Sequence, residues 1–126
     1  MSFTIRNCNV GSGHKPFVIA ELSANHNGSK QRALDSIYCA KECGASAIKL
    51  QTYTADTITL DIKGGSFEIN DKNSLWKGQN LHNLYSKAHT PWEWHKEIFK
   101  RAKELGLICF SSPFDESAVD FLMDLD

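Results

Sequence analysis

The stretch Ala40-Lys41-Glu42-Cys43-Gly44, followed closely by Ser46-Ala47-Ile48-Lys49-Leu50-Gln51, decides the fold class of this chain. Its first part is typical of a helix that ends at a glycine, and its second part predicts a strand. The same order recurs at Ala102-Lys103-Glu104-Leu105-Gly106, which precedes the apolar run Leu107-Ile108-Cys109-Phe110. Strands that alternate with helices imply a parallel sheet with right-handed crossovers. We therefore predict an α/β fold.

Further elements follow from capping residues and from apolar periodicity. Residues 17–22 form a continuous apolar run and predict a third strand, fully buried. Ser29 is expected to cap the helix that ends near Cys43, and Thr90, followed by Pro91, to cap the helix that ends at Gly106. Other expected elements are a strand or hairpin at 3–10, a short helix at 80–87, and a last helix capped by Asp115 with Val119, Leu122 and Met123 packed on one side.

Polar side chains follow each predicted strand. Because side chains alternate along a strand, Lys49 and Gln51 point away from Ile48 and Leu50. Burying an unpaired ammonium is costly, so we expect Lys49 to have an anionic partner or a chemical role. The other two strands end in Glu21, with a polar loop at 23–28, and in Ser111-Ser112. Ligands of parallel α/β sheets bind at these carboxyl ends, which predicts a site for a phosphorylated or carboxylated small molecule. The alternative is that strand exits are polar because they reach water.

Length and composition limit the remaining possibilities. A (β/α)8 barrel takes about 250 residues, so we expect residues 1–126 to be its N-terminal portion, with about three βα units. A net charge of −1 gives no reason to expect a nucleic-acid or membrane partner. The N-terminus lacks the pattern of a signal peptide, and we expect a cytoplasmic protein. The four cysteines contain no C-x-x-C pair and favour buried structural thiols over a metal site.

Three motifs carry a resemblance to a known family. They are Ala20-Glu21-Leu22-Ser23-Ala24-Asn25-His26-Asn27-Gly28, Ala47-Ile48-Lys49-Leu50-Gln51-Thr52-Tyr53 and Phe110-Ser111-Ser112-Pro113-Phe114. Together they resemble the nonulosonic (sialic) acid synthases over essentially the whole chain. The Leu-Ser-Ala form of the first motif and the stretch from Ala88 to His95 favour the branch that makes pseudaminic acid over the N-acetylneuraminic and legionaminic branches.

The resemblance implies a condensation of phosphoenolpyruvate with a 2,4-diacetamido-2,4,6-trideoxy hexose, with release of phosphate by C–O cleavage. It implies a divalent metal, Mn²⁺ or Mg²⁺, whose ligands are expected beyond Asp126, so no metal ligand is assigned within this chain. It also implies a C-terminal antifreeze-like domain and a homodimer. On this basis the isolated 126-residue chain is expected to be inactive.

The resemblance also implies roles for individual residues. Lys49 is expected to hold phosphoenolpyruvate, and Glu21 to act near the sugar aldehyde and the attacking water. Gln51 and Ser112 are expected to contact the same ligand, whereas Ser111 faces the other way. Further substrate contacts are expected from Asn25, His26 and Tyr53. The alternatives are an ion pair between Lys49 and a downstream acid, and a Glu21 carboxylate satisfied by the 25–28 loop.

The segment 52–89 is long for a connection in a βα unit, and such loops are commonly lids or substrate walls. Its aromatic residues either pack on the sugar or hold the loop against the barrel; they are Tyr53, Phe67, Trp76 and Tyr85. Two other functions remain open: a Schiff-base aldolase with Lys49 as its nucleophile, and a non-catalytic sugar-binding fragment.

Overall fold

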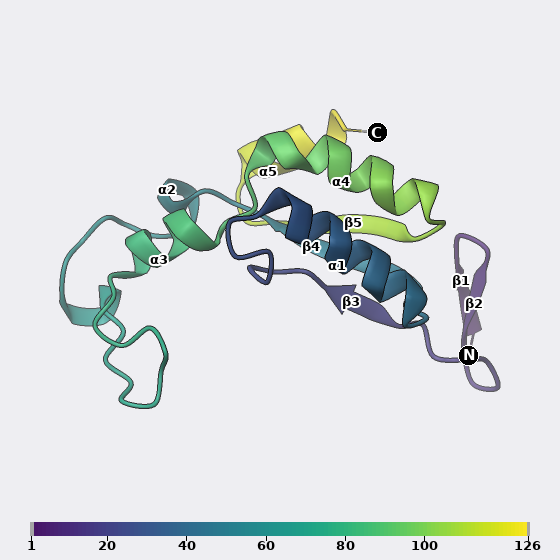
Figure 1. The fold of residues 1–126 in the computed structure, drawn as a ribbon, viewed down its shortest axis with the longest axis horizontal. Helices are drawn as coiled ribbons and strands as arrows, with labels where there is room; N and C mark the ends of the chain where they lie inside the picture. The colour runs from purple at the N-terminus through teal and green to yellow at the C-terminus, as the bar shows by residue number, and fades with distance from the viewer. Residues whose placement is uncertain (1, 126) are drawn as a thin grey trace.

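The computed structural model describes residues 2–125. Its centre is a parallel sheet in the order β3 (Ile19–Glu21), β4 (Ala47–Thr52) and β5 (Ile108–Pro113). Helices α1 (Lys30–Glu42) and α4 (Trp92–Glu104) lie side by side against one face of this sheet (Figure 1). Each helix connects two neighbouring parallel strands, so the predicted α/β class is confirmed.

Local signals set the ends of α1. The hydroxyl of Ser29 accepts a hydrogen bond from the backbone N–H of Arg32, as expected of an N-cap. After the helix, Gly44 adopts a φ of +84°, a left-handed conformation that costs glycine little. The predicted helix from Ser29 to Cys43 is therefore confirmed.

The predicted cap of α4 is wrong. The N-cap position is occupied by Pro91, and no side chain caps the helix. Thr90 is instead buried, and its hydroxyl lies 3.4 Å from Nε2 of His26. A threonine hydroxyl can make only a few hydrogen bonds. Here it contacts the distant His26 instead of a backbone N–H in the first turn of α4.

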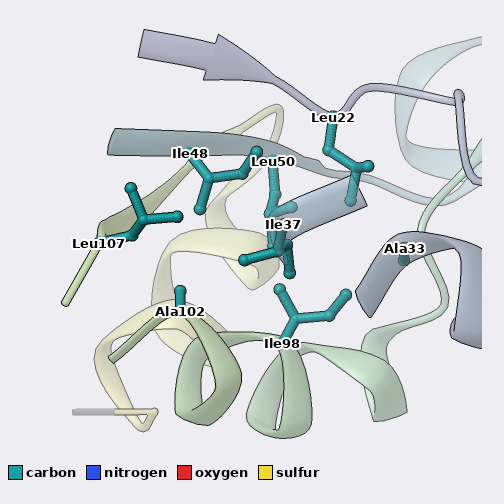
Figure 2. Packing of buried hydrophobic residues seen from close by; sticks show 8 residues of the cluster. All are labelled: Leu22, Ala33, Ile37, Ile48, Leu50, Ile98, Ala102 and Leu107. Atoms are coloured by element: carbon teal, nitrogen blue, oxygen red, sulfur yellow. The ribbon is translucent and has the colours of Figure 1, made fainter. Parts of the chain in front are cut away.

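The core lies between the sheet and the two helices (Figure 2). Each member of its central cluster is at most 4% exposed. The cluster consists of Leu22, Ala33, Ile37, Ile48, Leu50, Ile98, Ala102 and Leu107. Ile48 and Leu50 point toward α1 and α4, so Lys49 and Gln51 project from the opposite face of the sheet, as alternation predicts.

The prediction of a fully buried strand at 17–22 is wrong. Strand β3 covers only Ile19–Glu21, and Val18 and Ile19 are 50% and 42% exposed. Among the described residues β3 pairs with β4 alone, and the helices cover only one sheet face. The expected burial of residues 107–110 is only partly confirmed, since Phe110 is 36% exposed. The reason is again a missing neighbour, because β5 is at the edge of the sheet among the described residues.

The remaining elements lie around this central layer. They are the hairpin of β1 (Ser2–Ile5) and β2 (Cys8–Gly11), the helices α2 (Ala55–Ile58) and α3 (Leu81–Ala88), the 3₁₀ turn η1 (Gly65–Phe67), and α5 (Glu116–Met123). The connection with α2, η1 and α3 projects from the carboxyl ends of the strands, and the hairpin lies at the opposite end (Figure 1). No helix among residues 2–125 is long and apolar enough to cross a membrane.

Two smaller expectations have mixed outcomes. Asp115 caps α5 by accepting a hydrogen bond from the N–H of Ser117, as predicted, but Val119 and Met123 are 42% and 73% exposed rather than packed. Of the cysteines only Cys109 is well shielded, and burial raises the pKa of its thiol to about 12. The expected burial of the other three is wrong; they are Cys8, Cys39 and Cys43.

Candidate active site

Strand register brings four of the predicted site residues to one face of the sheet. Glu21 of β3 is in register with Lys49 of β4, and Gln51 of β4 is in register with Ser112 of β5. Residues in register on neighbouring parallel strands point to the same side, and Lys49 and Gln51 are two positions apart on one strand. This face, with Glu21, Lys49, Gln51 and Ser112 at the carboxyl ends of the strands, is called the rim below.

The rim is centred on an ion pair. Nζ of Lys49 lies 2.6 Å from Oε1 of Glu21, and the two side chains are 25% and 57% exposed. The anionic partner expected of Lys49 is therefore the acid of the preceding strand rather than an acid further along the chain. Because both side chains are partly exposed to solvent, such an ion pair contributes at most about 1 kcal/mol to the free energy of folding. A bound anion could therefore compete with Glu21 for the Lys49 ammonium at little cost in stability.

A second rim contact joins Ser23 to Gln51. The hydroxyl of Ser23 donates to Oε1 of Gln51 at 3.0 Å, which fixes the amide and leaves its NH₂ group without a partner among residues 2–125. Ser23 has a φ of +48°, an uncommon conformation for a residue that is not glycine. Non-glycine residues in such conformations are frequent at functional sites. Sequence reasoning placed Ser23 in a polar loop and did not identify this contact, which depends on the register of two strands.

The two serines that end β5 point to opposite faces, as predicted. Ser112 is half-buried on the rim, and its hydroxyl makes no hydrogen bond with any described residue. Ser111 points to the helix side of the sheet, where its Oγ lies 2.6 Å from Oγ1 of Thr52. Ser112 is therefore the hydroxyl of this pair that a ligand on the rim could reach.

Asn25 and His26 shape the loop between β3 and α1. Nδ2 of Asn25 donates to the carbonyl of Leu22 at 2.9 Å. His26 is 0% exposed, its Nδ1 accepts from the N–H of Gly28 at 3.1 Å, and its ring packs edge-on against Trp94. Burial lowers the pKa of His26, because the charged imidazolium would lose its hydration. The structure thus gives His26 a loop-shaping role, and its burial argues against the expected substrate contact.

Tyr53, which directly follows β4, is also buried. Its side chain is 4% exposed and packs edge-on against Tyr85 of α3 and Phe114. Burial raises the pKa of its phenol. This ring therefore holds the long connection against the end of β5. Of the two alternatives for the aromatic residues, the structure supports attachment of the loop for Tyr53 and not the expected substrate contact.

The residues of this segment do not fit a complete metal site. Residues 2–125 contain no group of three or more histidine, cysteine, aspartate or glutamate side chains arranged to hold an ion. The one histidine of the first motif, His26, already uses Nδ1 for Gly28 and faces Thr90 with Nε2.

A separate hollow lies in the long connection. It has a volume of about 430 Å³ and is bordered by Lys63, Glu68 and Lys87 together with neutral side chains and backbone. None of the four rim residues lines it. The rim is thus not identified as the candidate site by the size of a cavity. It is identified by a cation, a carboxylate, an amide and a hydroxyl that lie together at three adjacent strand ends.

Together, the parallel order β3-β4-β5, the helices between the strands and the polar carboxyl ends define a portion of a (β/α)8-barrel protein. The fold resembles the crystal structure of an N-acetylneuraminic acid synthetase from Leptospira borgpetersenii, with a TM-score of 0.75 at 24% identity over 99% of this chain and 38% of that one. The predicted fold class is thereby confirmed.

Sequence comparison defines the family. The model of the NeuB family matches residues 36–126, and the chain belongs to that family. It is 50% identical over 118 residues to the pseudaminic acid synthase of Campylobacter jejuni, covering 94% of this chain and 34% of that protein. It is 34% identical to the N,N'-diacetyllegionaminic acid synthase of Legionella pneumophila, covering 91% of this chain and 32% of that protein. The chain thus spans about a third of the length of these relatives.

Proposed function

We propose that the protein that carries this chain is a phosphoenolpyruvate-dependent synthase that makes pseudaminic acid from a 2,4-diacetamido-2,4,6-trideoxy hexose. The observation that carries the proposal is the rim, where the Lys49 ammonium is paired with the Glu21 carboxylate, and Gln51 and Ser112 project from the same sheet face at the carboxyl ends of parallel strands. Membership of the NeuB family and the higher identity to a pseudaminic acid synthase than to a legionaminic acid synthase support the choice of branch.

In the proposed complex the anionic groups of phosphoenolpyruvate contact Lys49, which acts as a compact point charge. The free NH₂ of Gln51 and the hydroxyl of Ser112 are placed to donate hydrogen bonds to the same ligand. Because Gln51 is fixed by Ser23, its donor is oriented before the ligand binds, which reduces the entropy lost on binding.

The reaction forms a bond between C3 of phosphoenolpyruvate and the aldehyde carbon of the open-chain sugar. Positive charge develops at C2, water adds there, and the bond between C2 and the bridging oxygen breaks as phosphate leaves. Glu21 is solvent-accessible and adjacent to Lys49, so its carboxylate is positioned to stabilise that charge or to accept a proton from the water. A divalent metal, Mn²⁺ or Mg²⁺, would polarise the aldehyde, and we place its ligands outside this chain.

We further propose that the rest of the barrel and an antifreeze-like domain lie outside residues 1–126, that the complete protein is a homodimer, and that it acts in the cytoplasm. The Schiff-base alternative is less well supported. The pairing with Glu21 at 2.6 Å favours Lys49 as an ammonium ion, and an ammonium ion has no electron pair with which to attack a carbonyl.

The test is phosphate release by the protein expressed from its complete reading frame, with phosphoenolpyruvate and Mn²⁺. The 2,4-diacetamido hexoses of the altrose and mannose types and N-acetylmannosamine are offered in parallel. Release with the altrose type alone is the expected result. Release with another sugar would retain the chemistry but change the branch, and no release with any sugar would favour a non-catalytic sugar-binding protein. Trapping of a substrate on Lys49 by borohydride would instead favour the aldolase.

A further inference from the structure

A chain of polar side chains is buried behind the rim, on the helix side of the sheet. Oγ of Ser111 lies 2.6 Å from Oγ1 of Thr52, which lies 2.8 Å from Nε2 of His95. Nδ1 of His95 lies 3.3 Å from the carbonyl oxygen of Pro91, where α4 begins. Thr52 and His95 are both 0% exposed. This set, from Ser111 to Pro91, is called the relay below.

The direction of each hydrogen bond in the relay follows from its last member. The Pro91 carbonyl can only accept, so Nδ1 of His95 carries the proton and Nε2 is the acceptor. Thr52 therefore donates its hydroxyl proton to His95 and accepts the proton of Ser111. This arrangement requires a neutral ring, and burial lowers the pKa of His95, which favours the neutral form. No member of the relay is left without a partner.

The relay joins two of the three strand ends that carry rim residues, those of β4 and β5. Thr52 directly follows Gln51 in β4, and Ser111 directly precedes Ser112 in β5. Because side chains alternate, the relay connects the strands on one face while Gln51 and Ser112 project from the other. The relay is anchored at the first turn of α4. The imidazole ring of His95 also packs edge-on against Phe121 of α5.

We propose that His95 is a positioning residue: through Thr52 and Ser111 it fixes the spacing of the ends of β4 and β5, and thereby of the Gln51 and Ser112 donors that bind phosphoenolpyruvate. This inference rests on the proposed function. It adds a role for a residue on the helix side of the sheet, away from the rim, that the sequence indicated only as the end of the stretch from Ala88 to His95.

Two amide variants of His95 separate positioning from simple packing. Glutamine places its terminal amide near the position of Nε2 and can accept from Thr52, whereas asparagine reaches only the position of Nδ1 near Pro91. Both variants lose the aromatic ring. We expect His95→Gln to keep the KM for phosphoenolpyruvate within about threefold of wild type, and His95→Asn to raise it by about tenfold, because a buried hydroxyl loses its acceptor.

Variants at the other end of the relay provide a second test if His95→Asn folds poorly. Thr52→Val keeps the shape of the side chain but removes the hydroxyl, and Ser111→Ala removes only the last donor. Both should raise the KM for phosphoenolpyruvate by several-fold, and Thr52→Val combined with His95→Asn should cost less than the product of the two single effects. A merely structural role would lower the folded fraction, and hence the apparent kcat, without changing KM.

The outcomes also separate this inference from the proposed function. If the wild-type protein releases no phosphate with any sugar, the proposed function fails and the inference fails with it. If the wild type is active but His95→Asn and His95→Gln have the same KM for phosphoenolpyruvate, the inference alone is overturned. A ¹⁵N spectrum of the wild type that shows His95 protonated at Nε2 rather than at Nδ1 would also overturn it.

Discussion

Replacing Lys49 by methionine should separate binding from stability. Methionine keeps the length of the apolar stem of lysine and removes only the charge. The lost partner, Glu21, is 57% exposed and remains hydrated, and Lys49 itself is 25% exposed. A solvent-exposed ion pair contributes at most about 1 kcal/mol, so the melting temperature should fall by only a few degrees.

The effect on the reaction should be much larger. Loss of one partner of a desolvated charge pair between protein and ligand costs roughly 2–5 kcal/mol. This range corresponds to a decrease in kcat/KM for phosphoenolpyruvate of about thirtyfold to several thousandfold. The effect on the reaction exceeds the effect on stability for one reason. Glu21 stays hydrated when Lys49 is lost, whereas the anionic groups of bound phosphoenolpyruvate would be left without a cationic partner.

The assay is continuous phosphate release, with thermal unfolding of the same preparations. Lys30→Met is the matched control, because Nζ of Lys30 lies 2.7 Å from Glu97 and joins α1 to α4 without contact to any rim residue. Its side chain and that of Glu97 are 45% and 50% exposed, so its stability change should be similarly small and its kinetics unchanged. The reasoning is refuted if Lys49→Met keeps kcat/KM within threefold of wild type, or if Lys30→Met loses as much activity.

Three further predictions concern buried residues outside the rim. Burial lowers the pKa of His26 and of His95, so below pH 6.5 the unfolded chain binds more protons than the folded chain. As the pH decreases through this range, the free energy of unfolding should therefore fall by up to about 1.4 kcal/mol per pH unit for each ring. Denaturant unfolding at pH 7.5 and 5.5 measures this slope, and a His95→Gln variant with the wild-type slope would contradict it. Tyr53→Phe should keep both stability and the KM for the sugar, whereas Tyr53→Ala should lose about 3–5 kcal/mol; a raised sugar KM in Tyr53→Phe would restore the substrate contact expected from the sequence. Ile98→Ala, in the centre of the core, should lose about 2–5 kcal/mol of unfolding free energy with little change in KM, and a loss below 1 kcal/mol would show that this core is not closely packed.

The parts of the fold that the sequence predicts correctly are local. The Ser29 and Asp115 caps and the glycine that follows α1 depend on residues within one helical turn. The side of the sheet on which Lys49 lies also follows from alternation along a single strand. These features require no knowledge of how distant segments meet.

The incorrect predictions concern contacts between distant segments. Thr90 has the composition of a cap, but a tertiary contact with His26 takes its hydroxyl. The apolar run at 17–22 has the composition of a buried strand, but burial of β3 requires neighbours on both edges and faces. In both cases the local pattern is compatible with two outcomes, and the three-dimensional environment selects one.

The candidate site shows the same division. The motifs indicated Lys49 and Glu21 as separate residues, but their ion pair follows from the register of β3 and β4, which no motif encodes. The motifs also included His26 and Tyr53, and motif membership does not distinguish a residue that contacts a ligand from one that supports the loop. The relay of His95 could not be inferred from the sequence, because Thr52 lies 43 positions from His95 and 59 positions from Ser111 along the chain.

The most direct test of the rim is a crystal structure of the complete protein with phosphoenolpyruvate bound. We predict a phosphate or carboxylate oxygen of the ligand within about 3 Å of Nζ of Lys49, and another within hydrogen-bond distance of the Ser112 hydroxyl. The account is contradicted if phosphoenolpyruvate binds away from the ends of β3, β4 and β5, with Lys49 still paired to Glu21 alone.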